Sequence, residues 1–173
     1  MNFPLDETAL SAIEQAVADR VPLLVAIAPY LTAIRAEAGA TVIDESAGAA
    51  RDDTAAALRF LAQSTRDSGR SIAILGELES NPADALEDHD YLGRLIVRLN
   101  IDQLIAVGHA ARHIQSAAGL EGSWDGESVI VDTIAEAYDL VRDNIRENDV
   151  VLVKASSSAG LAPLIDLLAG AAR

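Results

Sequence analysis

The residues best suited to chemistry lie near the C-terminus, where Lys154 and the serines at positions 156–158 follow the apolar run Val150–Val153. The run is short and β-branched, which favours a strand, and leucine and isoleucine then recur at helical spacing from Leu161 to Leu168. A lysine and hydroxyls between a strand and a helix start could bind a phosphate or a carboxylate. Alternatively, the serines cap the helix and Lys154 is a solvated loop residue.

The type of residue at position 154 favours a specific role. Lys154 is the only lysine among the 13 basic residues, so the chain uses arginine everywhere else. The compact ammonium of lysine and the planar guanidinium of arginine are not interchangeable in a binding site. This difference adds weight to the anion-site interpretation.

The strand that precedes Lys154 is the last of five similar units. Each unit has a short apolar run that predicts a strand, followed by a segment with helical periodicity. The predicted strands are Thr41–Ile43, Ser71–Leu75, Gln103–Val107, Ser128–Val131 and Val150–Val153. The predicted helices are Ala55–Gln63, Asp90–Leu99, Ala110–Ala117, Ile134–Ile145 and Leu161–Leu168. Five such units predict an α/β, Rossmann-like fold with a mainly parallel, doubly wound sheet, whose strands are buried on both faces.

The first 40 residues have a different character. Their apolar residues predict two helices, Leu5–Val17 and Val21–Ala38, with Gly39 ending the second. We therefore divide the chain into a helical appendage, residues 1–40, and an α/β domain, residues 41–173. We expect the appendage to cover a surface of the domain, either within the chain or across a homodimer, or to bind a partner protein.

Ligands of open α/β sheets bind outside the carboxyl ends of the strands. The polar residues expected at this edge, and taken as candidate ligand contacts, are Asp44, Glu45, Ser46, Glu77, Lys154 and Ser156. Gly76 and Gly108 also follow strands, where each could allow a ligand close to the backbone or form a tight turn.

Metal binding has little support in the sequence. His109 and His113 are four apart on an expected helix, but no third ligand completes a site. The acidic pairs Asp44/Glu45 and Asp52/Asp53 could hold Mg²⁺ or act as an acid and base, yet acidic surface is the common outcome in such a chain. His89 lies in an acidic run that reads as a solvated helix start. We expect no metal site.

Composition and missing motifs exclude several classes of function. The 27 acidic and 13 basic residues of this 173-residue chain give a net charge of −14, which opposes binding to nucleic acid and anionic membranes. No apolar run is long enough to span a bilayer, there is no cysteine, and the first ten residues do not resemble a signal peptide, so we expect a cytoplasmic protein. The motifs G-x-G-x-x-G, G-x-x-x-x-G-K-[ST] and G-x-S-x-G do not occur.

Seven blocks of sequence carry a resemblance to a known family. They are VID at 42–44 with AAAL at 55–58, GRSIAILGEL at 69–78, His89 with LGRL at 92–95, LIAVG at 104–108, LEGSWDGESVIVD at 120–132, AY at 137–138 and NDVVLVKASSSAGL at 148–161. In order and spacing, the chain from Thr41 onward resembles the C-terminal domain of Mur ligases, especially those that add D-alanyl-D-alanine to UDP-N-acetylmuramoyl-tripeptide.

The resemblance implies a Rossmann-like domain that closes over a central ATPase domain and contributes to the pocket for nucleotide and substrate. It also implies use of ATP and Mg²⁺ by the whole ligase, whereas we expect this chain to bind no cofactor. His89, Lys154 and Ser156 match positions of the family's pattern. The loop of the type D-D-S-Y-N-A-N-P is changed, because small residues follow Asp44, Glu45 and Ser46 here.

These departures suggest a fold that persists after its substrate contacts have drifted. We therefore expect a stand-alone, non-catalytic module that binds a partner protein or a UDP-muramoyl-peptide-like precursor in peptidoglycan synthesis. The alternatives are the lid subunit of a split ATP-dependent ligase, an inert remnant, and an excised domain of such a ligase.

Overall fold

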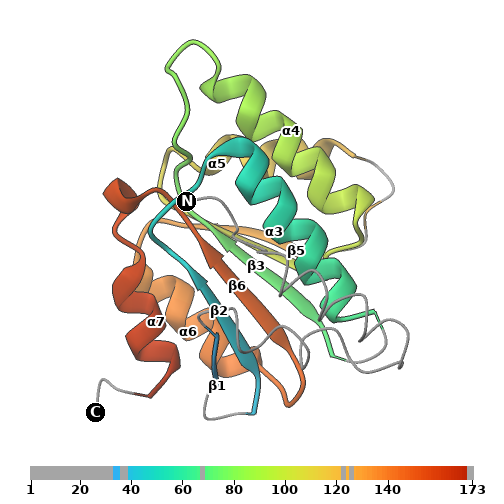
Figure 1. Cartoon of the computed structure of the whole chain (residues 1–173), viewed down its shortest axis with the longest axis vertical. Helices are drawn as coiled ribbons and strands as arrows, with labels where there is room; N and C mark the ends of the chain where they lie inside the picture. The colour runs from blue at the N-terminus through green and yellow to red at the C-terminus, as the bar shows by residue number, and fades with distance from the viewer. Residues whose placement is uncertain (1–32, 36–38, 67–68, 122–123, 125–126, 171–173) are drawn as a thin grey trace, which may run out of the picture.

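The computed structural model describes residues 33–35, 39–66, 69–121, 124 and 127–170. These residues form one sheet with helices on both faces (Figure 1). The strands are β1 (Ala33–Arg35), β2 (Thr41–Glu45), β3 (Ser71–Leu75), β4 (Gln103–Val107), β5 (Glu127–Val131) and β6 (Val150–Lys154). The helices are α3 (Arg51–Ser64), α4 (Ala85–Arg98), α5 (Arg112–Leu120), α6 (Ile134–Asn144) and α7 (Ala162–Leu168), with the 3₁₀ turn η2 (Ser157–Ala159) before α7.

The strand order is β1-β2-β6-β3-β4-β5. All neighbouring pairs from β2 to β5 are parallel, and β1 is the one antiparallel strand among the described residues, beside β2. The predicted mainly parallel α/β sheet is therefore confirmed. Because β6 lies between β2 and β3, its last residue is flanked by the ends of both strands.

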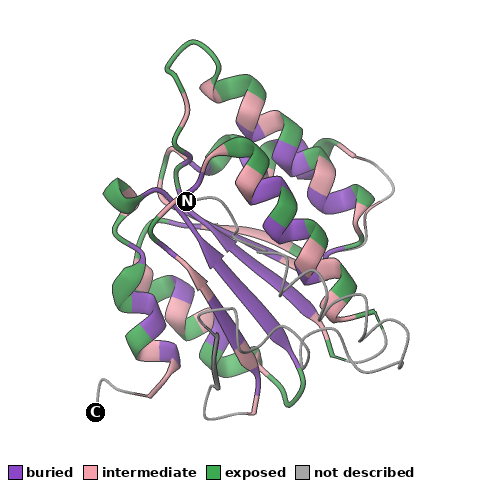
Figure 2. Ribbon diagram, in the orientation of Figure 1, coloured by how far each residue is buried: buried purple, intermediate pink, exposed green. Residues whose placement is uncertain are grey.

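Two hydrophobic layers hold the sheet. Helices α3, α4 and α5 cover one face, whereas α6 and α7 cover the other. Every residue of β3 and β6 is buried, as the purple strands in Figure 2 show. This burial explains why these strands have continuous apolar runs in place of alternating ones.

The predicted helix Val21–Ala38 is wrong over its last part. Ala33–Arg35 forms β1, which pairs with Thr41–Ile43 of β2. Without β1, the backbone groups on that edge of β2 would have no strand partner, so pairing there overrides helix propensity. The rest of the two predicted N-terminal helices lies outside the described residues. β1 also precedes residue 41, where we placed the start of the α/β domain.

Two helices begin earlier than the sequence predicted. α3 begins at Arg51 in place of Ala55, and α4 begins at Ala85 in place of Asp90. Both first turns contain two acidic residues, which suit the positive end of a helix dipole but interrupt the apolar period used to find the helices. None of the helices in the described part of the chain is long and apolar enough to cross a bilayer.

Candidate functional site at the carboxyl edge of the sheet

Lys154 is the most buried charged side chain at the carboxyl edge, with only 2% of its surface exposed. Its Nζ atom donates to Glu45 Oε2 at 2.9 Å and to the carbonyl oxygen of Gly48 at 2.8 Å. Register explains the first contact, because Lys154 lies directly beside Glu45 in the parallel pair of β6 and β2. The interpretation of Lys154 as a solvated loop residue is therefore wrong: it is the last residue of a buried strand.

The ion pair changes what this edge can do. Glu45 balances the positive charge of Lys154, and its own carboxylate remains partly exposed, at 24% of the side chain. A buried ammonium with two acceptors is a structural support, whereas an anion-binding lysine would need to present its charge to solvent. An incoming anion would have to displace Glu45 to reach it.

Asp44 and Ser46 form a local turn at the end of β2. Oδ1 of Asp44 accepts hydrogen bonds from the backbone N–H of Ser46 at 3.0 Å and from its hydroxyl at 2.7 Å. Ser46 is buried, so its hydroxyl already has an acceptor within the turn. These contacts direct the chain from β2 toward α3.

Main-chain hydrogen bonds join the loops that follow β2, β3 and β6. The N–H of Ser156 donates to the carbonyl of Glu77 at 2.8 Å, and the N–H of Glu79 donates to the carbonyl of Ala49 at 2.9 Å. Gly76 lies where these loops converge, and a Cβ atom there would be 2.8 Å from Cβ of Ala155. The structure thus gives Gly76 a role that the sequence analysis did not consider, because its missing Cβ lets the loop after β6 pack against it.

The serines after β6 do not cap α7. The cap position of α7 is Leu161, which makes no side-chain cap hydrogen bond. The hydroxyl of Ser156 is buried and lies 2.9 Å from that of Ser158. The structure also brings Glu77 and Ser156 together, because the carbonyl oxygen of Glu77 accepts a hydrogen bond from the N–H of Ser156. The side chain of Glu77 is exposed beside this loop.

His89 is buried, at 4% exposed, which contradicts its interpretation as part of a solvated helix start. It lies on the inner face of α4 with Leu92, Gly93 and Ile96, and its Nδ1 contacts the carbonyl oxygen of Ala85. Its Nε2 atom is buried without a hydrogen-bond partner among the described residues. No hydrogen bond or ion pair found in the described chain connects His89 to Lys154 or to the Asp44 turn.

The acidic pairs do not form a metal site. Asp44 accepts from Ser46, Glu45 binds Lys154, and Asp52 pairs with Arg51 at 3.1 Å. No group of three histidine or acidic residues in the described ranges could hold a metal ion. The described residues therefore do not fit the Mg²⁺ that the family resemblance implies for a whole ligase.

The two remaining histidines do not share a helix. α5 begins at Arg112, so His113 is helical whereas His109 lies in the preceding turn, where its carbonyl oxygen accepts from the N–H of Arg112 at 3.2 Å. The expected common helix face for these two side chains is therefore wrong.

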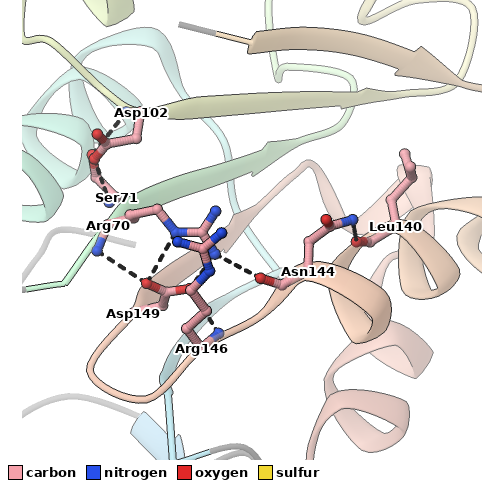
Figure 3. Close-up of polar contacts among 7 residues, drawn as sticks. All are labelled: Arg70, Ser71, Asp102, Leu140, Asn144, Arg146 and Asp149. Carbon is pink, nitrogen blue, oxygen red and sulfur yellow. Dashed lines mark hydrogen bonds and ion pairs between the residues drawn. The ribbon is translucent and has the colours of Figure 1, made fainter.

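Sequence reasoning missed two contacts of charged residues. The first is the carbonyl oxygen of Gly48, which is a backbone group, so no residue type in the sequence indicated that it would accept a hydrogen bond from Lys154. The second involves Asp149, which lies 2% exposed at the opposite, amino edge of the sheet (Figure 3). Its carboxylate accepts from Arg70 Nη2 at 2.6 Å and from the N–H groups of Arg70 and Arg146 at 3.1 and 2.9 Å.

The hydrogen bonds to Asp149 favour the ionised form of its carboxyl group. Burial alone would raise its pKa, but the side-chain bond from Arg70, the two N–H donors and the charge of Arg70 together hold the pKa below its usual value. The same bond to Asp149 raises the pKa of Arg70. This network fixes the turn before β6 and the start of β3.

Three kinds of comparison place the chain among known proteins. Residues 31–157 match the family described as Mur ligase, glutamate ligase domain. The chain is 40% identical over 145 residues to the UDP-N-acetylmuramoyl-tripeptide–D-alanyl-D-alanine ligase of Mycobacterium leprae, a match that covers 76% of this chain and 28% of that protein. The corresponding ligase of Mycobacterium tuberculosis H37Rv is 37% identical over 146 residues, covering 75% of this chain and 29% of the relative.

Solved structures agree at the level of the fold. A crystal structure of MurF from Acinetobacter baumannii superimposes with a TM-score of 0.67 at 24% identity, over 81% of this chain and 30% of that one. MurF from Thermotoga maritima, in complex with ADP, gives a TM-score of 0.66 at 16% identity, over 81% and 30% of the two chains. The chain thus spans less than a third of the length of these proteins.

Proposed function

Because this chain belongs to the Mur ligase family through its glutamate ligase domain, we propose that it is a binding module of peptidoglycan precursor synthesis in the cytoplasm. It binds a UDP-muramoyl-peptide-like precursor or a protein that handles one. It does not form the amide bond by itself. The relatives that it matches are named UDP-N-acetylmuramoyl-tripeptide–D-alanyl-D-alanine ligases, which supports a ligand of this class.

One observation carries the non-catalytic part of the proposal. Lys154, the only lysine of the chain, is buried, and its ammonium donates hydrogen bonds to Glu45 and to the carbonyl oxygen of Gly48. At the same edge, Asp44 accepts hydrogen bonds from the N–H and the hydroxyl of Ser46. The sequence contains no phosphate-binding loop motif, and Lys154 already has a carboxylate partner, which supports a role in recognition without activation of a carboxylate by ATP.

A second function is favoured by a different observation. The identity of 40% extends over 145 residues, which is far more than a shared fold requires. Such similarity supports the chain as the lid of a split ligase, supplied in trans to a subunit that carries the ATPase. In that case, Glu45 and Lys154 shape the edge that faces the other subunit.

Calorimetric titration of the purified chain separates these functions. We expect UDP-N-acetylmuramoyl-tripeptide to bind, ATP with Mg²⁺ not to bind at micromolar concentrations, and no phosphate to be released when D-alanyl-D-alanine is added. Amide formation by the chain alone would refute the binding-module proposal. Turnover that appears only after a separate ATPase subunit is added would establish the split ligase.

A further inference from the structure

A hollow lies at the amino edge of the sheet, on the opposite side from Lys154. It has a volume of about 600 Å³ and is enclosed by the second half of α3, the end of α4 and the residues just before β3 and β4. Its polar lining includes Arg59, Gln63, Thr65, Arg66, Arg98 and Asn100. Since none of these residues belongs to the carboxyl edge, the hollow is separate from the site described above.

The charge of this hollow is opposite to that of the chain. Three of the 13 basic residues surround it, although the chain as a whole has a net charge of −14. Asp102 is the one acidic residue among the residues found to line it. Its Oδ2 atom accepts from the N–H and the hydroxyl of Ser71 at 2.8 and 2.7 Å, which commits that oxygen to the sheet (Figure 3).

The three arginines differ from four others in the chain. Arg51, Arg70, Arg94 and Arg142 each form an ion pair with an aspartate. By contrast, no ion pair joins Arg59, Arg66 or Arg98 to a carboxylate within the described ranges. Arg59 Nη2 donates to the hydroxyl of Tyr91 at 3.2 Å, and this neutral partner orients the side chain without balancing its charge.

Unpaired guanidinium groups gathered around a hollow suit a multiply charged anion. Each guanidinium can donate two parallel hydrogen bonds to a phosphate or carboxylate, and it is more weakly hydrated than an ammonium. Asn100 and Gln63 add amide donors to the lining. Although the 27 acidic residues outnumber the 13 basic ones, no ion pair among the described residues joins a carboxylate to these three arginines.

We propose that this hollow binds a small polyanion with at least two phosphate or carboxylate groups. The proposal does not depend on the function of the carboxyl edge, because the two sites share no residue. Arg66 follows the end of α3, whereas Arg98 is the last residue of α4. An anion bound to both arginines would therefore bridge the ends of the two helices. Arg59 contributes from the side of α3 that faces Tyr91.

The test is titration of the full chain with pyrophosphate and, separately, with citrate at low ionic strength. The variant is R66Q/R98Q. Its matched control is R112Q/R146Q, which removes the same charge from exposed arginines that lie outside the hollow. We expect saturable binding of one anion per chain, weakened about tenfold or more in R66Q/R98Q and changed by less than about twofold in the control.

Amide chemical shifts provide the second readout, with the largest changes expected at Gly69 and Asn100. Tighter binding of pyrophosphate would assign the ligand to phosphates, and tighter binding of citrate would assign it to carboxylates. The proposal fails if neither anion saturates, or if both double variants weaken binding equally. It also fails if R66Q/R98Q lowers the urea midpoint but leaves binding unchanged, since the arginines would then serve only the negative ends of α3 and α4.

Discussion

Lys154 and Glu45 form a buried ion pair of 2.9 Å between residues 109 positions apart in the sequence. The two partners are not equally buried, because Lys154 is 2% exposed and Glu45 is 24% exposed. This inequality decides which substitution the protein tolerates better.

We expect Glu45→Ala to destabilise the chain more than Lys154→Met. The first change leaves an ammonium buried with only the carbonyl of Gly48, a loss of about 3–5 kcal/mol in the free energy of unfolding. The second removes the buried charge and leaves Glu45 able to reach water, a loss of about 1–2 kcal/mol. Urea unfolding measures both. A larger loss in Lys154→Met would contradict the structural role of the pair.

The double variant Glu45→Ala/Lys154→Met completes this cycle. It should be close in stability to Lys154→Met alone, because no charge is left without a partner. An additive loss would mean that the two side chains act independently.

The bond network of Asp149 predicts a pH-dependent stability. Its pKa is lowered in the folded state, so its contribution is complete above the unfolded value, about 3.9, and is lost as the pH falls through the folded value. At pH 7, Asp149→Asn should cost about 3 kcal/mol, and this difference from the unsubstituted chain should shrink below about pH 4. Urea unfolding at a series of pH values tests it.

Asp139→Asn is the matched control for this experiment. Asp139 also pairs with an arginine, Arg142, but its side chain is 58% exposed. Such a surface pair contributes about 0–1 kcal/mol, so its removal should leave the pH profile nearly unchanged. Equal effects of the two substitutions would show that burial of Asp149 is not what matters.

Gly76 and Gly119 should respond to alanine in opposite ways. At Gly76, the new Cβ would lie 2.8 Å from Cβ of Ala155, and overpacking of this kind costs about 1–3 kcal/mol. At Gly119, within α5, nothing lies within 4 Å of the new atom, so alanine should stabilise the helix by up to about 1 kcal/mol. Thermal unfolding of both variants measures the contrast. A neutral Gly76→Ala would mean that the loop after β6 yields easily.

Two truncations test what covers the edge of β2. Deletion of residues 1–32 retains β1 beside β2, whereas deletion of residues 1–38 removes β1 and exposes the backbone groups of that edge. Open edges promote association between sheets. We expect the longer deletion to self-associate more than the shorter one in size-exclusion chromatography with light scattering. If both remain monomeric, β1 does not protect the sheet.

The sequence predicted the five parallel strands because their apolar runs are buried on both faces, as Ser71–Leu75 and Val150–Lys154 illustrate. It could not predict β1, whose only reason to be a strand is the edge of β2. His89 was recoverable, since it recurs with Leu92, Gly93 and Ile96 at helical spacing on the inner face of α4.

The sequence predicted where Glu45 and Lys154 lie in the sheet, but it did not predict that they pair with each other. The order of the strands places Glu45 and Lys154 at the same edge, and both were expected there. Their mutual neutralisation depends on a register between β2 and β6 that no local pattern specifies. Asp102 and Asp149, at the amino edge, follow no strand and were not considered.

The acceptor that Gly48 provides to Lys154 is its main-chain carbonyl oxygen. Substitution at position 48 therefore cannot delete that acceptor, and Ala47, Ala49 and Ala50 are likewise free to change as far as the lysine is concerned. The sequence of the loop after β2 can therefore change while the ammonium of Lys154 keeps its backbone acceptor. Mutational scanning of positions 47–50 should accordingly reveal tolerance wherever a side chain fits, beside strict demands at Glu45.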